Sequence, residues 1–185
     1  MIALTSTAAR LIAGSVSDYL APPAPVVHLP PAPKLRRPKR LSCSRMNILF
    51  LFAAIMFSGF FVVASGVVHA RPELFWLVSS SIGAGYGAVF CLAPTVVSVV
   101  WGTRNFGTNW GIISMAPALG AVVYGCMFAG EYDTGAGAGA GADAGACYGW
   151  VCVRYSFSAM AASVVLAVAG WGWVWRAWNR AGVVV

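Results

Sequence analysis

The chain has 185 residues, of which 59% are hydrophobic and only 9% are charged, and its net charge is +7. An ordinary soluble domain carries about 25% charged residues, so the composition argues against a water-facing globular surface and indicates a membrane protein. Six of the twelve basic residues lie in one block at 34–45, directly before a long apolar run. A nucleic-acid-binding patch is the alternative interpretation. We rank it lower and expect no nucleic acid partner, because no aromatic-rich soluble domain accompanies the block.

The first apolar segment, residues 1–20, is barely long enough to span a bilayer. It lacks the charged start and the clean apolar centre of a signal peptide, so we interpret it as the remaining part of a transmembrane helix whose beginning is missing. Arg10, Gly14 and Asp18 follow one another at intervals of four, and the spacing predicts that they share one helical face. Asp18 is the only acidic residue before Glu73.

Residues 21–46 form a linker rich in proline and basic residues. Proline removes hydrogen-bond donors and favours extended chain, so we expect little fixed structure there. The positive-inside rule assigns this basic flank to the cytosol. We interpret His28 within it as a solvated residue and not as a ligand.

Four charge-free stretches follow, at 47–68, 74–103, 105–130 and 155–175. Each has the roughly 20 apolar residues that a helix needs to cross a hydrocarbon core of about 30 Å. Backbone polar groups inside lipid must pair within the segment, so these stretches predict helices. The predicted four-helix bundle covers residues 47–178, and 179–185 form a tail. With linker and tail in the cytosol, nine of the twelve basic residues lie at cytosolic flanks and four of the five acids lie on the other side.

Residues 131–154 are predicted to form an external loop that contains the low-complexity run "TGAGAGAGADAGA". Cys147 and Cys152 lie in this loop with four residues between them. A disulfide is a candidate in an oxidising compartment, and two free thiols are the alternative, because spacing alone does not establish the geometry. No second cysteine pair or nearby histidine supplies a zinc site.

The long helices contain no carboxylate, and the two histidines lie in the linker and in a turn. A catalytic constellation cannot be assembled from these groups, so we expect no enzyme activity, cofactor or metal. The helices are rich in small residues and proline, which permit close approach and kinks. The positions that we assign to bending or packing are Gly83, Gly87, Pro94, Gly111, Pro117 and Gly120. They fit tight packing alone, and they also fit a transporter whose helices rock around a central path.

Three pieces of the sequence resemble the C-terminal half of the major facilitator superfamily. "STAARLIAGSVSDYLAP" resembles the end of helix eight and the loop after it, and "GYGAVFCLAPT" with "FGTNWGI" resembles helices ten and eleven of a fungal branch. "CYGWVCVRYSF" and the Trp-rich segment after it resemble the last loop and helix twelve. The branch is the nodulin-like, monocarboxylate-transporter-homologue group. The resemblance covers most of the chain except the linker and the Gly/Ala loop. It implies an all-α partial bundle made of the end of helix eight plus helices nine to twelve.

The resemblance also implies roles for single residues. Gly14 and Asp18 match a G-x-x-x-D pattern that belongs to a cytosolic charge network, with Arg10 on the same face. The usual basic partners follow only after the linker insertion. A solvated helix end is the alternative for Asp18. Three polar residues are candidates for the substrate path, although such residues more often bond to a neighbouring helix: Tyr86, Thr95 and Asn109.

The function implied by the resemblance is secondary transport of a small solute, with proton coupling as an option. The expected location is the vacuolar membrane, with the plasma membrane second. The 185-residue chain lacks the first bundle, so we expect a fragment or truncated gene product that needs N-terminal helices in cis. A non-transporting packing or accessory membrane protein is the alternative. "Monocarboxylate" is a family label, and no basic residue lies within the long helices to pair with a carboxylate.

Overall fold

The computed structural model describes residues 1–20, 45–138, 147 and 149–180. Helices make up the described part of the chain, and it contains no strand. In chain order the elements are α1 (Ile2–Leu20), α2 (Arg45–Ala64), α3 (Val67–Ala70), the 3₁₀ turn η1 (Pro72–Leu74), α4 (Phe75–Trp101), α5 (Phe106–Ala138), the 3₁₀ turn η2 (Trp150–Cys152) and α6 (Arg154–Arg180). Four spans are long and apolar enough to cross a membrane, at Arg45–Ala64, Pro72–Trp101, Phe106–Gly135 and Arg154–Ala177. The prediction of a partial all-α membrane bundle is therefore confirmed.

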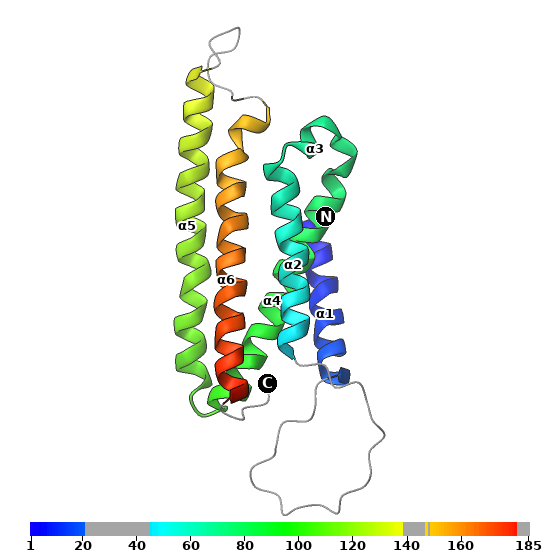
Figure 1. Ribbon diagram of the computed structural model, residues 1–185, viewed down its shortest axis with the longest axis vertical. Coiled ribbons are helices and arrows are strands. Elements are labelled where there is room, and N and C mark those ends of the chain that lie inside the picture. The colour runs from blue at the N-terminus through cyan, green and yellow to red at the C-terminus, as the bar shows by residue number, and fades with distance from the viewer. Residues whose placement is uncertain (21–44, 139–146, 148, 181–185) are drawn as a thin grey trace, which may run out of the picture.

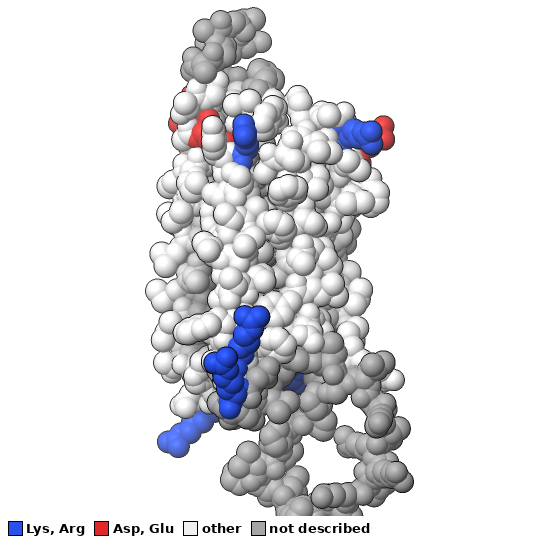
Figure 2. All heavy atoms as spheres, viewed as in Figure 1, with Lys and Arg blue, Asp and Glu red and all other residues white. Residues whose placement is uncertain are grey.

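The long helices lie side by side along the long axis of the molecule (Figure 1). We call the end where α1 stops and α2 starts the linker end, and the end where α5 stops and α6 starts the loop end. Basic atoms lie towards both ends in Figure 2, acidic atoms appear only at the loop end in that view, and a wide uncharged band separates the ends. A band without charge is the surface that hydrocarbon requires.

Helix α4 is the centre of the packing, because it contacts both α1 and α2, while α2 also contacts α6. The main buried cluster joins these four helices through Ala13, Ile48, Leu49, Ala88 and Leu92, with Phe52 and Trp171 packed against it. Helix α5 contacts α4, α6 and η2 only lightly, and none of its described residues is buried. The bundle therefore has a packed part and an outlying helix.

The first predicted span ends earlier than the sequence indicates, because α2 stops at Ala64 within the stretch 47–68. Gly66 has φ +77° and begins the short α3. Only glycine adopts this left-handed conformation without strain. A Cβ at this position would also lie 3.4 Å from the ring of Trp150, so a residue 84 positions away in the chain packs against this turn.

The predicted external loop 131–154 is wrong over its first eight residues, because α5 continues to Ala138. The hydroxyl of Thr134 donates to the carbonyl oxygen of Gly130 within this extension, and alanine, the best helix former, is frequent in it. Residues 139–146 and 148 lie outside the described part. Two smaller differences concern the predicted linker, whose last two residues start α2, and the predicted tail, whose first two residues end α6. The rest of the linker and of the tail lies outside the described residues.

Candidate functional site

Helices α1 and α4 run in the same direction and approach closely along two glycines of α4. Ile2 lies against Gly83, and Ser6 lies against Gly87. A Cβ on Gly83 would lie 2.8 Å from the carbonyl oxygen of Ile2, and one on Gly87 would lie 2.8 Å from the Cα of Ser6. These distances are shorter than real Cβ contacts, so both positions need glycine for the two backbones to meet in this way.

The third glycine of this run, Gly85, faces α2 instead. A Cβ there would lie 2.8 Å from the carbonyl oxygen of Phe52, and one on Gly59 of α2 would lie 2.7 Å from the side chain of Ile82. Residues two apart on a helix point about 200° away from each other. Gly83 and Gly87 therefore face α1, Gly85 faces α2, and α4 packs between these two helices.

Arg10, Gly14 and Asp18 lie on α1 beside the face that packs on α4, not at its centre. The buried residues of α1 are Ser6, Ala9, Ala13 and Ser17. The side chains of Arg10 and Asp18 are exposed, and they lie about 12 Å apart along the axis, so they do not pair with each other. No described basic side chain pairs with Asp18 either, and the linker bases lie outside the described residues.

Gly14 contacts α4 at Cys91. A Cβ on Gly14 would lie 3.4 Å from the Sγ of Cys91, and this thiol lies 3.4 Å from the carbonyl oxygen of Arg10, to which it donates. No pattern in the sequence singled out Ser17, which is 2% exposed and whose Oγ has no partner among the described residues. The sequence places Ser17 next to Asp18, but the burial of Ser17 follows only from the packing of α1 on α4.

The three candidate path residues lie at different places. The side chain of Tyr86 is 46% exposed, and its ring lies 4.5 Å from that of Phe90. The hydroxyl of Thr95 donates to the carbonyl oxygen of Cys91 at 3.3 Å, within its own helix. Asn109 is half-buried near the start of α5. Thr95 lies nine positions after Tyr86, about 14 Å along α4, so these two hydroxyls do not meet.

Thr95 lines a small cavity of about 320 Å³ at the linker end, together with Pro94, Ser98, Thr103 and Phe106. Pro94 lies inside α4, where proline removes one helical hydrogen bond. The hydroxyl of Ser98 donates to the carbonyl oxygen of Thr95 at 2.9 Å. The hydroxyls of Thr95 and Ser98 are thus engaged as donors to their own helix, while their oxygens remain available as acceptors towards the cavity.

Helix α5 carries the other predicted bending positions. Pro117 lies within it. A Cβ on Gly111 would meet nothing within 4 Å, and one on Gly120 would meet only the ring of Tyr124 at 4.0 Å, in the same helix. Among the described residues, these two glycines are therefore not at a close helix contact, unlike Gly83 and Gly87.

At the loop end, α5 and α6 are joined through Glu131. Its carboxylate accepts hydrogen bonds from the backbone N–H of Tyr155 at 2.8 Å and from the backbone N–H of Ser156 at 2.9 Å. It also accepts one from the Ser156 hydroxyl at 2.6 Å. Two of the N–H groups that a helix start leaves unpaired are satisfied in this way. This role could not be predicted from the sequence, because the cap comes from another helix and leaves no local motif.

Cys147 and Cys152 form a disulfide with a Cα–Cα distance of 6.0 Å. The bridge lies against Gly135 near the end of α5, where a Cβ would contact the Sγ of Cys147 and lie 3.6 Å from that of Cys152. The loop end of α5 is therefore tied to α6 by a carboxylate cap and by a packed disulfide loop. Among the described residues, no group of three or more His, Cys, Asp or Glu side chains is placed to hold a metal ion.

Comparison with known proteins gives one consistent result. The chain is 43% identical over 137 residues to "Probable transporter mch1" of Neurospora crassa, and 40% identical over 134 residues to "Probable transporter MCH1" of Gibberella zeae. It is 30% identical over 132 residues to the protein of that name in Saccharomyces cerevisiae. The chain is a homologue of the fungal MCH1 proteins. The resemblance found in the sequence is thereby confirmed.

The matched part is 73% of this chain but 23% of the Neurospora crassa protein, and 71% of this chain but 24% of the Saccharomyces cerevisiae protein. The chain therefore spans about a quarter of the length of these MCH1 relatives. No protein-family model matches the chain, and no solved structure matches it.

Proposed function

We propose that this chain is the C-terminal part of a secondary transporter that moves a small solute across a membrane. The observation that carries the proposal is the 43% identity to a protein named as a probable transporter. The packing gives support, because α4 combines a close glycine interface with an internal proline. Kinked helices packed on rigid neighbours are typical of transporters that work by alternating access.

Within that function, Asp18 belongs to a charge network at the linker end that stabilises one access state. Arg10 and Gly14 share its side of α1, and Gly14 holds this side near α4 through Cys91. The exposure of Asp18 supports the role, because a carboxylate at the surface can meet a basic group of the linker or of a helix outside the described residues.

The solute path involves polar groups of α4 and α5, with Tyr86 near the middle of α4 and Thr95 and Asn109 nearer the linker end. The half-exposed Tyr86 ring supports this assignment, since polar groups within a membrane are most often turned to a cavity or to another helix. Proton coupling is part of the proposal, and no cofactor and no enzymatic step are required.

The bundle works in a lipid bilayer, with the vacuolar membrane as the first location and the plasma membrane as the second. Its linker end faces the cytosol. N-terminal helices in the same polypeptide complete the cavity, because the chain spans about 23% of the relatives that it matches. A central site between two six-helix bundles needs these helices.

The first experiment is to map the 5′ end of the native transcript. An in-frame extension that encodes further apolar segments is the expected result. The longer protein, reconstituted in vesicles, should then take up labelled small solutes, whereas this chain alone should not. A transcript that starts at Met1, together with absence of flux, would favour the second candidate, a non-transporting accessory membrane protein. The outlying α5, with no buried described residue, is the observation that favours it.

A further inference from the structure

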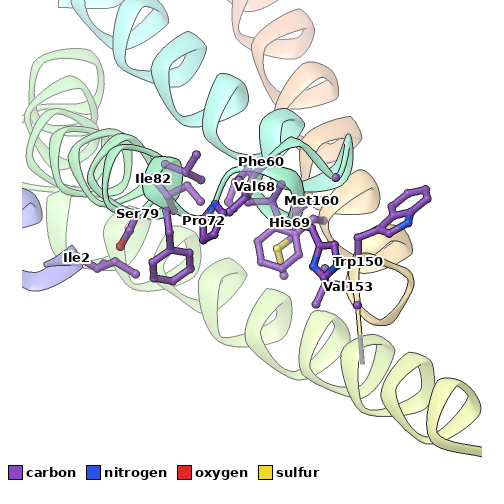
Figure 3. A pocket seen from close by; sticks show the side chains of 16 residues that line it. Ile2, Phe60, Val68, His69, Pro72, Ser79, Ile82, Trp150, Val153 and Met160 are labelled. Carbon is purple, nitrogen blue, oxygen red and sulfur yellow. The ribbon is translucent and has the colours of Figure 1, made fainter. Parts of the chain in front are cut away.

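A cavity of about 840 Å³ lies at the loop end of the bundle. Figure 3 shows its labelled side chains in a row, from Ile2 on α1, past α4, α3 and α2, to Trp150 beside the start of α6. The volume is in the range of pockets that hold small molecules, roughly 300–1,000 Å³. A row of lining side chains fits a chain-like occupant better than a compact one.

The wall of this cavity is almost entirely apolar. Among the residues that line it, only Ser79, His69 and the indole of Trp150 carry a polar side-chain group. The α4 residues that line it recur every three or four positions between Phe75 and Ile82, so they form one face about 10 Å long. The cavity thus covers roughly the outer third of a hydrocarbon core of about 30 Å. A polar solute would find few hydrogen-bond partners here.

Arg154 does not itself line the cavity, but it lies over the ring of Trp150, which lines one end of the row. The guanidinium of Arg154 lies 4.7 Å from the centre of the Trp150 ring and 5.9 Å from that of Tyr155. Trp150 and Val153, its near neighbours in the chain, both line the cavity. Glu131, a described acidic residue at the start of α6, already accepts hydrogen bonds from Tyr155 and Ser156. Arg154 forms no ion pair with a described acidic side chain, so its planar donors are open to an anion.

We propose that this cavity binds a phospholipid of the loop-end leaflet, with an acyl chain along the apolar row and the phosphate at Arg154. The geometry sets the direction in which the lipid lies. Trp150 and Arg154 lie at the loop end, whereas the start of α1, and with it Ile2, lies further from that end than α3 does in Figure 1. Indole and guanidinium groups at headgroup level with apolar groups deeper are the usual order at a membrane interface.

The phosphate contact decides the selectivity. Lipid tails are as apolar as the cavity wall, so the hydrophobic effect does not favour the cavity over the bilayer. A bidentate contact between guanidinium and phosphate is specific and charge-assisted. A sterol has an apolar body but no phosphate, so it should bind worse. This inference goes beyond solute transport and applies to the cavity as residues 1–185 form it.

The test uses the full chain in phosphatidylcholine vesicles that contain a small fraction of phosphatidylcholine with a photoactivatable acyl chain. After illumination, mass spectrometry locates the lipid adducts. We expect them to concentrate on the cavity residues Phe60, Ile82 and Met160. Adducts spread evenly over outward-facing residues such as Leu166, which is 73% exposed, would overturn the proposal.

Two variants with matched controls test the occupant. Val153→Trp fills the row and should abolish the cavity adducts, while Val165→Trp on the outer side of α6 should preserve them. Arg154→Gln should lower them about tenfold, while Arg104→Gln at the linker end should have no effect. If Val153→Trp fails to fold, the comparison of Arg154→Gln with Arg104→Gln decides alone. Unchanged labelling in Arg154→Gln, or equal labelling by a photoactivatable sterol, would refute the phospholipid site.

Discussion

The carboxylate of Glu131, near the end of α5, caps α6 by accepting hydrogen bonds from both the backbone N–H and the hydroxyl of Ser156. The Ser156 side chain is 1% exposed, so these groups have no ready substitute in water. A negative charge at a helix start is also favoured by the helix dipole. One side chain therefore supplies much of the connection between two helices that otherwise touch lightly.

Replacing Glu131 by Gln should destabilise the bundle by about 1–2 kcal/mol, because the charge and part of the cap are lost. The loss appears as a lower midpoint of thermal unfolding in detergent. Glu73→Gln is the control, since Glu73 is exposed at the same end and caps no long helix. Equal midpoints for the two variants would contradict the role of the cap.

Gly87→Ala should destabilise the bundle by about 1–3 kcal/mol, because the new methyl group meets the backbone of Ser6 and neither helix can yield without moving. Gly111→Ala is the matched control in an open position. There alanine should be neutral or stabilise the helix by up to about 1 kcal/mol. Circular dichroism during heating measures both, and a tolerated Gly87→Ala would show that the close contact between α1 and α4 is not needed.

Cys147→Ser should lower the free energy of unfolding by about 2 kcal/mol, the loss expected when a short loop is opened. Alkylation of the purified chain without reductant should leave these two cysteines unmodified, while Cys126, which is free and exposed, reacts. After reduction, mass spectrometry should show two further modified thiols. Modification of Cys147 before reduction would disprove the bridge.

Asp18→Asn should change the balance between access states in a longer protein that contains the upstream helices. The carboxylate is exposed on α1, so its neutralisation should act on a charge contact and not on packing. Accessibility of introduced cysteines to a water-soluble reagent, with and without solute, measures the change. Asp133→Asn at the loop end is the control, and an unchanged accessibility pattern in Asp18→Asn would remove the gate assignment.

Much of the fold was predictable because length and absence of charge are sufficient to identify a membrane helix. The ends of the helices were harder to predict. Trp150 packs against Gly66 just after the end of α2, and the extension of α5 accompanies a cap that Glu131 provides to residues 24 and 25 positions away. Such contacts have no local pattern in the sequence.

The candidate site, too, was only partly predictable from the sequence. A spacing of four correctly indicates that Arg10, Gly14 and Asp18 share a side of α1, but only the partner helix shows that the buried face is centred on Ala13 and Ser17. Likewise, the spacing of Gly83, Gly85 and Gly87 fixes their relative directions, but not which neighbour each one meets. Periodicity describes one helix, whereas a site depends on two.

The two-sided glycine packing of α4 has a mechanical consequence. At Gly83, Gly85 and Gly87 the missing side chain leaves room mainly for backbone atoms of α1 and α2, with Thr5 and Met56 beside them, and backbone atoms have no rotamers to exchange. A force on any one of α1, α2 and α4 is therefore passed to the other two with little give, and the three helices move as a single stiff block. Displacement within the bundle concentrates at α5, which lies outside this block and has no buried residue among those described.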